Sequence, residues 1–360
     1  MTKPDLRGMT SGELEQYMIA TGEAPFRGRQ VAAWLHGRGA SRIADMTNIP
    51  RELRGRLARE ARVVNLELVS ERQTRKGDAR KYLFRLEDGE TIETVLLTLE
   101  TSQSVCLSTQ VGCPVGCDFC ATGAIGFRRN LGAGEIVDQF LKARARLTQG
   151  ERITNIVFMG MGEPLLNFDS LTRAISIFTS REGPGFSPRR ITVSTCGIVP
   201  GIHKLIAAGI TPELAISIIA ADEKKRQELF PLARTYPLHE VVEAARHYSR
   251  FIKRPVTFEY LILKGINDSK RDAHLLGELV RSVRCKINLI RYNPSHTPRF
   301  TPSSEERAEA FRQWLEPFCA AVTVRKSKGE EIEAACGQLR AGYTTYVKSM
   351  TNTGTRSVPH

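Results

Sequence analysis

From residue 104 onward, short apolar segments alternate with amphipathic ones, and this alternation limits the folds open to the chain. Each apolar segment is rich in Val, Ile or Leu, as buried strands are. The expected strands are Val105–Gln110, Thr154–Phe158, Ile191–Ser194, Leu214–Ala220, Val256–Leu263, Lys286–Tyr292 and Ala321–Arg325. The expected helices are Ala133–Leu147, Leu171–Phe178, Pro200–Ala208, Leu238–Arg250 and Asp272–Val283. Buried strands separated by helices predict parallel β/α units that form a barrel or partial barrel.

Three cysteines follow the first expected strand, in the segment Cys113-Pro-Val-Gly-Cys117-Asp-Phe-Cys120. Their C-x3-C-x2-C spacing and the glycines around them suit a loop that wraps a small inorganic group. Three thiolates are typical of an iron–sulfur cluster, or of part of a zinc site that needs a fourth ligand. No second Cys or His pair follows, since the other cysteines are single: Cys106, Cys196, Cys285, Cys319 and Cys336. The spacing favours a cluster with one iron left open; structural zinc and unligated core thiols are the alternatives. The loop follows a strand, and barrel chemistry is found at the C-terminal ends of strands.

The segments before residue 104 differ in character. Residues 1–62 have helical apolar spacing, with Thr10 and Glu13 as a capping box, and they are dense in arginine. We interpret them as a small helical domain that docks RNA; a solvated basic face is the alternative. Residues 64–100 alternate as strands do, and Asp88-Gly89 supplies a hairpin turn. The expected domains are a helical domain (1–63), a β-hairpin extension (64–103), the core barrel (104–342) and a polar tail (343–360).

Composition narrows the class of partner and the compartment. The 360 residues carry a formal net charge of +13, which indicates a polyanion such as nucleic acid, although a protein can simply be basic. The N-terminus lacks an apolar signal region, and no apolar run approaches the ~20 residues of a membrane span. Eight cysteines without a small secreted framework indicate a reducing compartment. We therefore expect a cytoplasmic protein with no membrane partner.

Six motifs in order extend the evidence beyond the cysteine triplet. They are Cys106–Cys113, Ala121–Leu131, Phe158–Pro164, Arg189–Thr195, Lys286–Pro294 and Glu330–Leu339. With these motifs the chain resembles the RlmN/Cfr family of radical S-adenosylmethionine RNA methyltransferases over roughly residues 8–342, and is closest to the RlmN branch. The resemblance implies a partial (β/α)6 barrel with an N-terminal helical domain and a β extension. It implies methylation at C2 of an adenosine in 23S rRNA, and in some bacteria also in tRNA. A Cfr-like enzyme would instead methylate C8.

The resemblance also assigns cofactors and their contacts. It implies a [4Fe-4S] cluster held by Cys113, Cys117 and Cys120, and two molecules of S-adenosylmethionine for each methyl transferred. The open iron would chelate the methionine part of S-adenosylmethionine, whose reduction gives a 5′-deoxyadenosyl radical. Contacts to S-adenosylmethionine fall on Gly162, Glu163, Ser194, Ser217, Ile218, Ile219 and Asn293. An electron donor such as flavodoxin is the family's expectation, and a monomer is the default.

Three further residues are implied to act in the reaction. Cys336 accepts a methyl by polar displacement, and the radical then abstracts hydrogen from that S-methyl group. The resulting carbon radical adds to C2 of adenine. This carbon has no lone pair with which to attack a methyl sulfonium directly. Glu93 removes the proton from the adenine carbon, and only the motif register selects it over Glu90. Cys106 attacks the Cys336 sulfur, forms a disulfide and releases the methylated base. Without the resemblance, Cys106 and Cys336 would be interpreted as inert core thiols.

One position departs from the family pattern. Family members carry Ser-Leu-His where this chain has Ser217-Ile218-Ile219, so an imidazole is lost beside the cofactor. This substitution allows a radical enzyme with a divergent substrate as an alternative, although a retained Cys106/Cys336 pair argues against it. A zinc-bound RNA-binding module is the non-enzymatic alternative.

Overall fold

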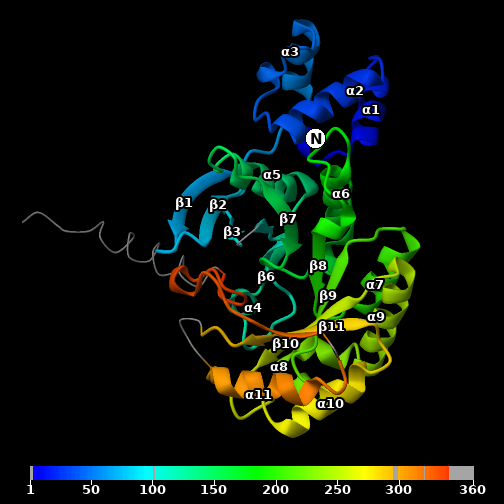
Figure 1. The fold of residues 1–360 in the computed structure, drawn as a ribbon. Helices are drawn as coiled ribbons and strands as arrows, with labels where there is room; N and C mark the ends of the chain where they lie inside the picture. The colour runs from blue at the N-terminus through cyan, green and yellow to red at the C-terminus, as the bar shows by residue number, and fades with distance from the viewer. Residues whose placement is uncertain (1–2, 100–101, 295–298, 320, 340–360) are drawn as a thin grey trace, which may run out of the picture.

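A ten-stranded curved sheet runs through the computed structural model, which describes residues 3–99, 102–294, 299–319 and 321–339 (Figure 1). Its order is β1-β2-β3-β4-β7-β8-β9-β10-β11-β12. The strands are β1 (Glu67–Gln73), β2 (Ala79–Arg85), β3 (Thr91–Thr98), β4 (Gln103–Cys106), β7 (Ile153–Phe158), β8 (Ile191–Thr195), β9 (Glu213–Ser217), β10 (Val256–Ile262), β11 (Cys285–Arg291) and β12 (Val322–Arg325). Within this sheet, β4 and the strands from β7 to β12 pair in parallel with their neighbours, whereas the pairs β1·β2, β2·β3 and β3·β4 are antiparallel.

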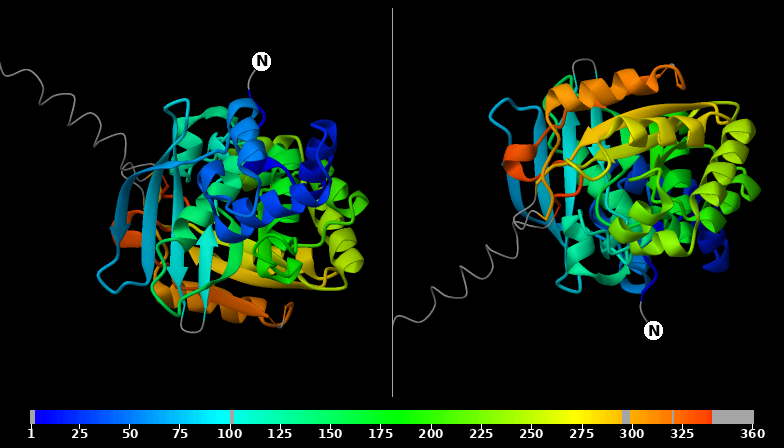
Figure 2. Two further views of the ribbon diagram at one scale, coloured as in Figure 1. Left: turned by 90° about the horizontal axis from the view of Figure 1, so that it is seen from above. Right: turned by 90° about the horizontal axis from the view of Figure 1, so that it is seen from below.

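Helices connect the parallel strands and lie on the outer side of the curved sheet (Figure 2). They are α5 (Ala133–Arg144), α6 (Phe168–Thr179), α7 (Val199–Ala207), α8 (Glu223–Leu229), α9 (Leu238–Ile252), α10 (Lys270–Val280) and α11 (Glu305–Leu315). Six crossovers from β4 to β12 form a partial (β/α)6 barrel, with β1–β3 as the antiparallel extension. The expected fold class is confirmed. The helices α8 and α11 were not among the expected elements.

Two strands end earlier than their apolar composition predicts. Strand β9 ends at Ser217 because Ile219 has a φ of +65°, a left-handed conformation that no strand accommodates. Strand β4 ends at Cys106 because the next residues leave the barrel for a two-stranded ribbon. That ribbon pairs β5 (Gln110–Gly112) with β6 (Phe127–Asn130), and the helix α4 (Ala121–Ile125) lies between them. The ribbon therefore holds both ends of the cysteine loop.

The N-terminal helices form their own core and dock on the barrel at α5. They are η1 (Leu6–Gly8), α1 (Ser11–Ala20), α2 (Phe26–Ala32), η2 (Ala33–Arg38), η3 (Ile43–Asp45) and α3 (Arg51–Glu60). The capping box of Thr10 and Glu13 is present. Arg7 forms a fully buried ion pair with Asp138 of α5, and the Asp138 carboxylate also accepts the backbone N–H of Leu66. The helical domain is thereby tied to the barrel through a charged contact that excludes water.

The last described segment, residues 326–339, crosses from β12 to the antiparallel extension and contains the 3-10 turn η7 (Glu330–Ile332). Lys328 Nζ donates to the carbonyl of Thr98 over 2.7 Å, and the backbone N–H of Arg75 donates to the Glu331 carboxylate over 2.6 Å. The segment thus bridges the two ends of the sheet. The expected polar tail at 343–360 lies outside the described residues. In the part of the chain that is described, no helix is both long and apolar enough to cross a membrane.

Candidate active site

A cavity opens at the C-terminal ends of the barrel strands, and we refer to it as the upper cavity. It is lined by Cys113, Val115, Cys117, Phe119, Cys120, Phe158, Met159, Gly160, Gly162, Glu163, Ser194, Thr195, Cys196, Ser217, Ile219, Phe230, Glu259, Leu261, Ile290, Tyr292, Cys336 and Gly337. The cysteine loop supplies one wall, and the ends of β7 to β11 supply the others. This is where a barrel concentrates its chemistry.

The three loop cysteines fit a cluster better than a single ion. All three thiols line the upper cavity, and the charges of Cys113 and Cys120 both act on Cys117. Within the described ranges, no three Cys, His, Asp or Glu side chains already surround one ion-sized point. A four-iron cluster needs its thiolates further apart than one ion does, because each thiolate binds a different iron. Burial raises the pKa of Cys113 to about 12, so a thiolate here needs a metal to compensate its charge.

Cys336 lies beside this loop because the chain brings the two together through backbone contacts. The N–H of Ala121, next to Cys120, donates to the carbonyl of Gly337 over 2.7 Å. The Asn293 side-chain amide donates to the carbonyl of Cys336 over 3.2 Å. Cys336 is exposed, and its surface faces the cavities that it lines. Although the residue as a whole is exposed, its thiol is directed into the fold; burial of the thiol raises its pKa, and the positive charge of Arg325 opposes that effect.

Glu163 is a buried carboxylate at the N-terminus of the turn that follows β7. Its Oε2 accepts the backbone N–H of Cys196 at 2.8 Å, and its Oε1 accepts the N–H of Leu165 at 3.0 Å. Burial raises the pKa of Glu163, and these hydrogen bonds oppose the rise. The preceding Gly162 has a φ of +103°, and a Cβ there would lie 2.6 Å from Gln110 Cβ. Glycine is therefore needed for packing against the ribbon as well as for lining the cavity.

The other predicted cofactor contacts divide into two groups. Ser194, Ser217 and Ile219 line the upper cavity. Ile218 is fully buried in the core and, like Asn293, does not line that cavity. The carbonyl of Ile219 accepts a hydrogen bond of 2.6 Å from the side chain of Asn267, which is itself fully buried. This contact holds the left-handed turn in place.

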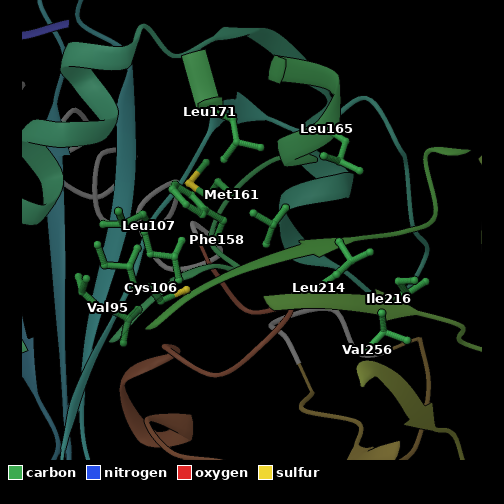
Figure 3. Close-up of a cluster of buried hydrophobic side chains, with 14 of the residues drawn as sticks. Val95, Cys106, Leu107, Phe158, Met161, Leu165, Leu171, Leu214, Ile216 and Val256 are labelled. Atoms are coloured by element: carbon green, nitrogen blue, oxygen red, sulfur yellow. The ribbon is translucent and has the colours of Figure 1, made fainter. Parts of the chain in front are cut away.

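A second cavity lies below the first, toward the N-terminal ends of the strands, and we refer to it as the lower cavity. Its walls are Val95, Leu97, Leu99, Ser104, Cys106, Val157, Met159, Arg189, Thr192, Glu213, Ala215, Arg254, Pro255, Thr257, Glu259, Lys286, Asn288, Arg325, Ala334, Ala335, Cys336 and Leu339. Cys106 and Cys336 therefore line the same cavity. Figure 3 shows Cys106 among apolar side chains, beside Val95 and Leu107. Burial raises the pKa of Cys106 to about 12.

Glu93 lies inside the β extension and lines neither cavity. Its Oε1 is 3.1 Å from Nζ of Lys81, and both side chains are buried. The same Nζ donates to the carbonyl of Glu333 over 3.0 Å, three residues before Cys336. The structure therefore brings Glu93 close to the segment that carries Cys336, but it encloses the carboxylate in an ion pair.

Several residues of the site are absent from the sequence predictions, among them Lys81, Cys196, Glu259 and Arg325. Glu259 was detectable, since a carboxylate in the apolar strand β10 has no ordinary structural role. It lines both cavities, its Oε1 accepts a 3.0 Å hydrogen bond from Asn288, and its Oε2 has no hydrogen-bond partner among the described residues. No sequence motif marks Lys81, Cys196 or Arg325, because only the tertiary fold places them beside the cysteines.

Comparison with known proteins shows the family to which the chain belongs. The radical SAM superfamily model matches residues 107–276, and the ribosomal RNA large subunit methyltransferase N-terminal domain matches residues 4–63. A probable dual-specificity RNA methyltransferase RlmN of Moorella thermoacetica is 44% identical, covering 94% of this chain and 98% of that protein. The dual-specificity RNA methyltransferase RlmN of Anaeromyxobacter dehalogenans is 43% identical over 94% of this chain and 92% of its own length.

A solved structure extends the likeness to three dimensions. The crystal structure of a radical SAM methyltransferase from Sphaerobacter thermophilus has a TM-score of 0.89 and 43% identity, covering 94% of this chain and 99% of that one. The superfamily uses a [4Fe-4S] cluster and S-adenosylmethionine, which the cysteine wall and the upper cavity suit. The chain belongs to the radical SAM superfamily and, within it, to the RlmN family of RNA methyltransferases.

Proposed function

We propose that this RNA methyltransferase adds a methyl group to C2 of an adenosine in 23S rRNA and also acts on tRNA. The observation that carries the proposal is the position of Cys336. It lines the upper cavity with the three loop cysteines and the lower cavity with Cys106. A thiol that accepts a methyl group and later forms a disulfide needs both neighbours. The names of the relatives, which call them dual-specificity RNA methyltransferases, support two RNA substrates.

Cys113, Cys117 and Cys120 would hold the cluster, and Glu163, Ser194 and Ser217 would line the place of S-adenosylmethionine. When bound, the reduced cluster and S-adenosylmethionine supply a radical that can abstract hydrogen from a methyl group. This chemistry suits a target carbon that has no lone pair with which to attack a methyl sulfonium.

The residues of the chain account for the remaining steps. Cys336, as a thiolate, accepts a methyl group at Sγ and carries the carbon that becomes bonded to the adenine. Glu93 removes the proton from the adenine carbon in the RNA–protein adduct. The Cys106 thiolate then attacks the Cys336 sulfur and forms the S–S bond as the S–CH2 bond breaks; the electron pair of the broken bond stays with the base, and the methylene carbon takes up a proton to become the methyl group. Lys81 holds the Glu93 carboxylate until the substrate is in place.

The surface charge supports an RNA substrate. The net charge is +13, and the exposed Arg51 and Arg59 lie on α3 of the N-terminal helical domain. On α2 and η2 of the same domain, guanidinium groups stack on aromatic rings, with Arg27 4.7 Å from the Phe26 ring centre and Arg38 4.1 Å from that of Trp34. Phe26 is exposed, and an exposed aromatic ring is the kind of group on which a base can stack.

Mass spectrometry of nucleosides from rRNA and tRNA, with and without the gene, tests the proposal. Loss of 2-methyladenosine from both RNAs on deletion is the expected result. Loss of 8-methyladenosine instead would move the activity to C8. If neither nucleoside changed, the proposal would fail, and the Ile219 substitution would become the leading guide to another substrate.

A further inference from the structure

The two cavities lie one above the other along the barrel. Side chains alternate along each strand, so residues two positions apart both face the interior of the barrel, at successive levels. On β8, Thr192 lines the lower cavity and Ser194 the upper one. On β9, Ala215 lines the lower cavity and Ser217 the upper one. Three residues line both, namely Met159, Glu259 and Cys336. Cys336 therefore has one side facing the cysteine loop and another facing the lower end of the barrel.

The lower cavity has a volume of about 550 Å³ and ends at exposed residues. Arg189 precedes β8 and Lys286 is the second residue of β11, so both lie at the N-terminal end of the barrel, and both are exposed. Cys106 and Cys336 line the same cavity. The cavity thus connects the solvent with the two cysteines from the end of the barrel opposite to the cluster loop.

The charges along this cavity favour an anion at its mouth. Four basic and two acidic side chains line it. Arg254 pairs with Glu213 over 2.8 Å, and Arg325 lies 3.7 Å from Glu259. No ion pair to Arg189 or Lys286 occurs within the described part of the chain. These two uncompensated cations attract anions from solution, most strongly at low salt.

We propose that the lower cavity admits a small anionic thiol, which reduces the Cys106–Cys336 disulfide and returns the enzyme to its starting state. The inference rests on the proposed function, because the disulfide is the product of its last step. One thiolate attacks a sulfur of the disulfide, which breaks the S–S bond, forms a mixed disulfide and releases the other cysteine. A second thiolate attacks the mixed disulfide and releases the second cysteine. The two cysteines take up two protons, and the reductant leaves as its own disulfide.

Burial explains why a small thiol suits this step better than a protein dithiol. Cys106 is only 9% exposed and lies in the main hydrophobic core. A protein reductant needs the disulfide at the surface, because its own thiol is carried on a folded domain. Approach through the upper cavity would require passage beyond the cluster and S-adenosylmethionine. The lower cavity reaches the same two sulfurs without disturbing either cofactor.

The test follows reduction of the disulfide in the full-length, cluster-loaded protein by alkylation and peptide mass spectrometry. The protein is first oxidised with diamide, and the Cys106–Cys336 linkage is quantified. Reduction is then timed with 2-mercaptoethanesulfonate (anionic), 2-mercaptoethanol (neutral) and cysteamine (cationic). At low salt, the double substitution Arg189→Glu/Lys286→Glu should lower the rate of disulfide reduction by the anionic thiol about tenfold. The rate with the neutral thiol should stay within twofold, and the rate with the cationic thiol should rise. The differences should shrink in 0.5 M salt, as screening predicts (Debye length about 4 Å at that concentration).

A matched control is Lys270→Glu/Arg271→Glu, which makes the same change in net charge on exposed residues of α10 that do not line the cavity. This control should leave all three rates unchanged. Equal rates for the wild type and the Arg189/Lys286 variant would overturn the route while leaving the disulfide step intact. So would faster reduction by a thioredoxin-type protein dithiol than by the anionic thiol at equal concentration. If oxidation produced no Cys106–Cys336 linkage at all, both the route and the resolving step of the proposed function would fail.

Discussion

Nζ of Lys81 lies 3.1 Å from Oε1 of Glu93, and both side chains are buried inside the β extension. The ammonium group also donates to the carbonyl of Glu333, three residues before Cys336. One side chain therefore contacts both the proposed general base and the segment that carries the proposed methyl acceptor. The two strands that hold the pair are adjacent, with Leu83 of β2 opposite Glu93 of β3.

Glu93→Gln should block proton removal while preserving the shape of the side chain. RNA covalently attached to the protein should accumulate. The rate at which methylated nucleoside forms should fall by about 10²–10⁴-fold, the usual rate contribution of a general base. Denaturing gels with labelled RNA would measure the adduct. Glu90→Gln on the same hairpin is the matched control and should retain activity within twofold. Equal losses of activity in Glu93→Gln and Glu90→Gln would show that Glu93 is not the general base.

Lys81→Met should destabilise the fold, because it leaves the Glu93 carboxylate buried without its cation. Breaking a buried pair from one side costs about 3–5 kcal/mol, and Lys81→Arg should recover part of this by keeping the charge. Urea unfolding would measure the loss. A Lys81→Met protein as stable as the wild type would show that Glu93 is compensated by another group.

Cys336→Ala and Cys106→Ala should stop the reaction at different stages. The Cys336 variant should load iron and sulfide fully but take up no methyl from labelled S-adenosylmethionine. The Cys106 variant should accept the methyl and then accumulate the RNA adduct, since no thiol is left to resolve it. Cys319→Ala is the control, because Cys319 is buried beside Cys285 and lines neither cavity. Normal turnover by the Cys106 variant would contradict the disulfide step.

The reactivity of Cys106 should keep rising with pH where an ordinary thiol has levelled off. Burial raises its pKa from 9.0 to about 12, so its thiolate fraction grows about tenfold per pH unit from pH 7 to 11. An exposed thiol with a pKa near 9 would reach a plateau above pH 9. Iodoacetamide labelling of the Cys106 peptide, followed by mass spectrometry from pH 7 to 10, checks the slope. A plateau near pH 9 would show that the thiol is better solvated than its position indicates.

The N-terminal helical domain should lose stability as the pH falls from about 6.5 to 4. His36 is fully buried, and burial lowers its pKa from 6.5 to about 4. Between these pH values His36 is protonated in the unfolded chain but neutral in the folded domain. The free energy of unfolding is therefore lower by about 3 kcal/mol at pH 4 than at pH 7. Thermal unfolding from pH 7 to 4 measures the effect. His36→Leu should flatten the pH dependence, whereas the exposed His239→Gln should leave it unchanged.

The alternation of apolar and polar residues was sufficient to predict most of the barrel. Five of the expected strands match β7, β8, β10, β11 and β12 to within one residue at either end. Most side chains of β7, β8 and β10 are buried or half-buried, so the apolar composition of these strands carries the signal. The helix α8 was missed because Glu223–Leu229 is short and charged, with little apolar periodicity. The end of β9 was missed because a left-handed isoleucine is imposed by tertiary contacts, including the hydrogen bond from Asn267.

Sequence predicted the parts of the site that depend on local spacing and motif register. The cysteine triplet lines one cavity, and Cys106 shares another with Cys336 across 230 residues. Spacing does not reveal the partners that the fold supplies, such as Lys81 for Glu93 or Arg325 for Cys336. Whether Glu93 acts on RNA stays a prediction, as do the individual cofactor contacts.

The segment that crosses from β12 to the β extension, and that carries Cys336, should be among the last parts of the chain to fold. Its contacts to Arg75, Lys81 and Thr98 join residues 256, 252 and 230 positions apart. Closing loops of this length costs the most chain entropy, and contacts of high sequence separation form late in folding. During synthesis the cysteine loop can therefore take shape long before Cys336 reaches it. In refolding experiments, the pairing of Cys106 with Cys336 should appear in the slowest phase, after the barrel helices have formed.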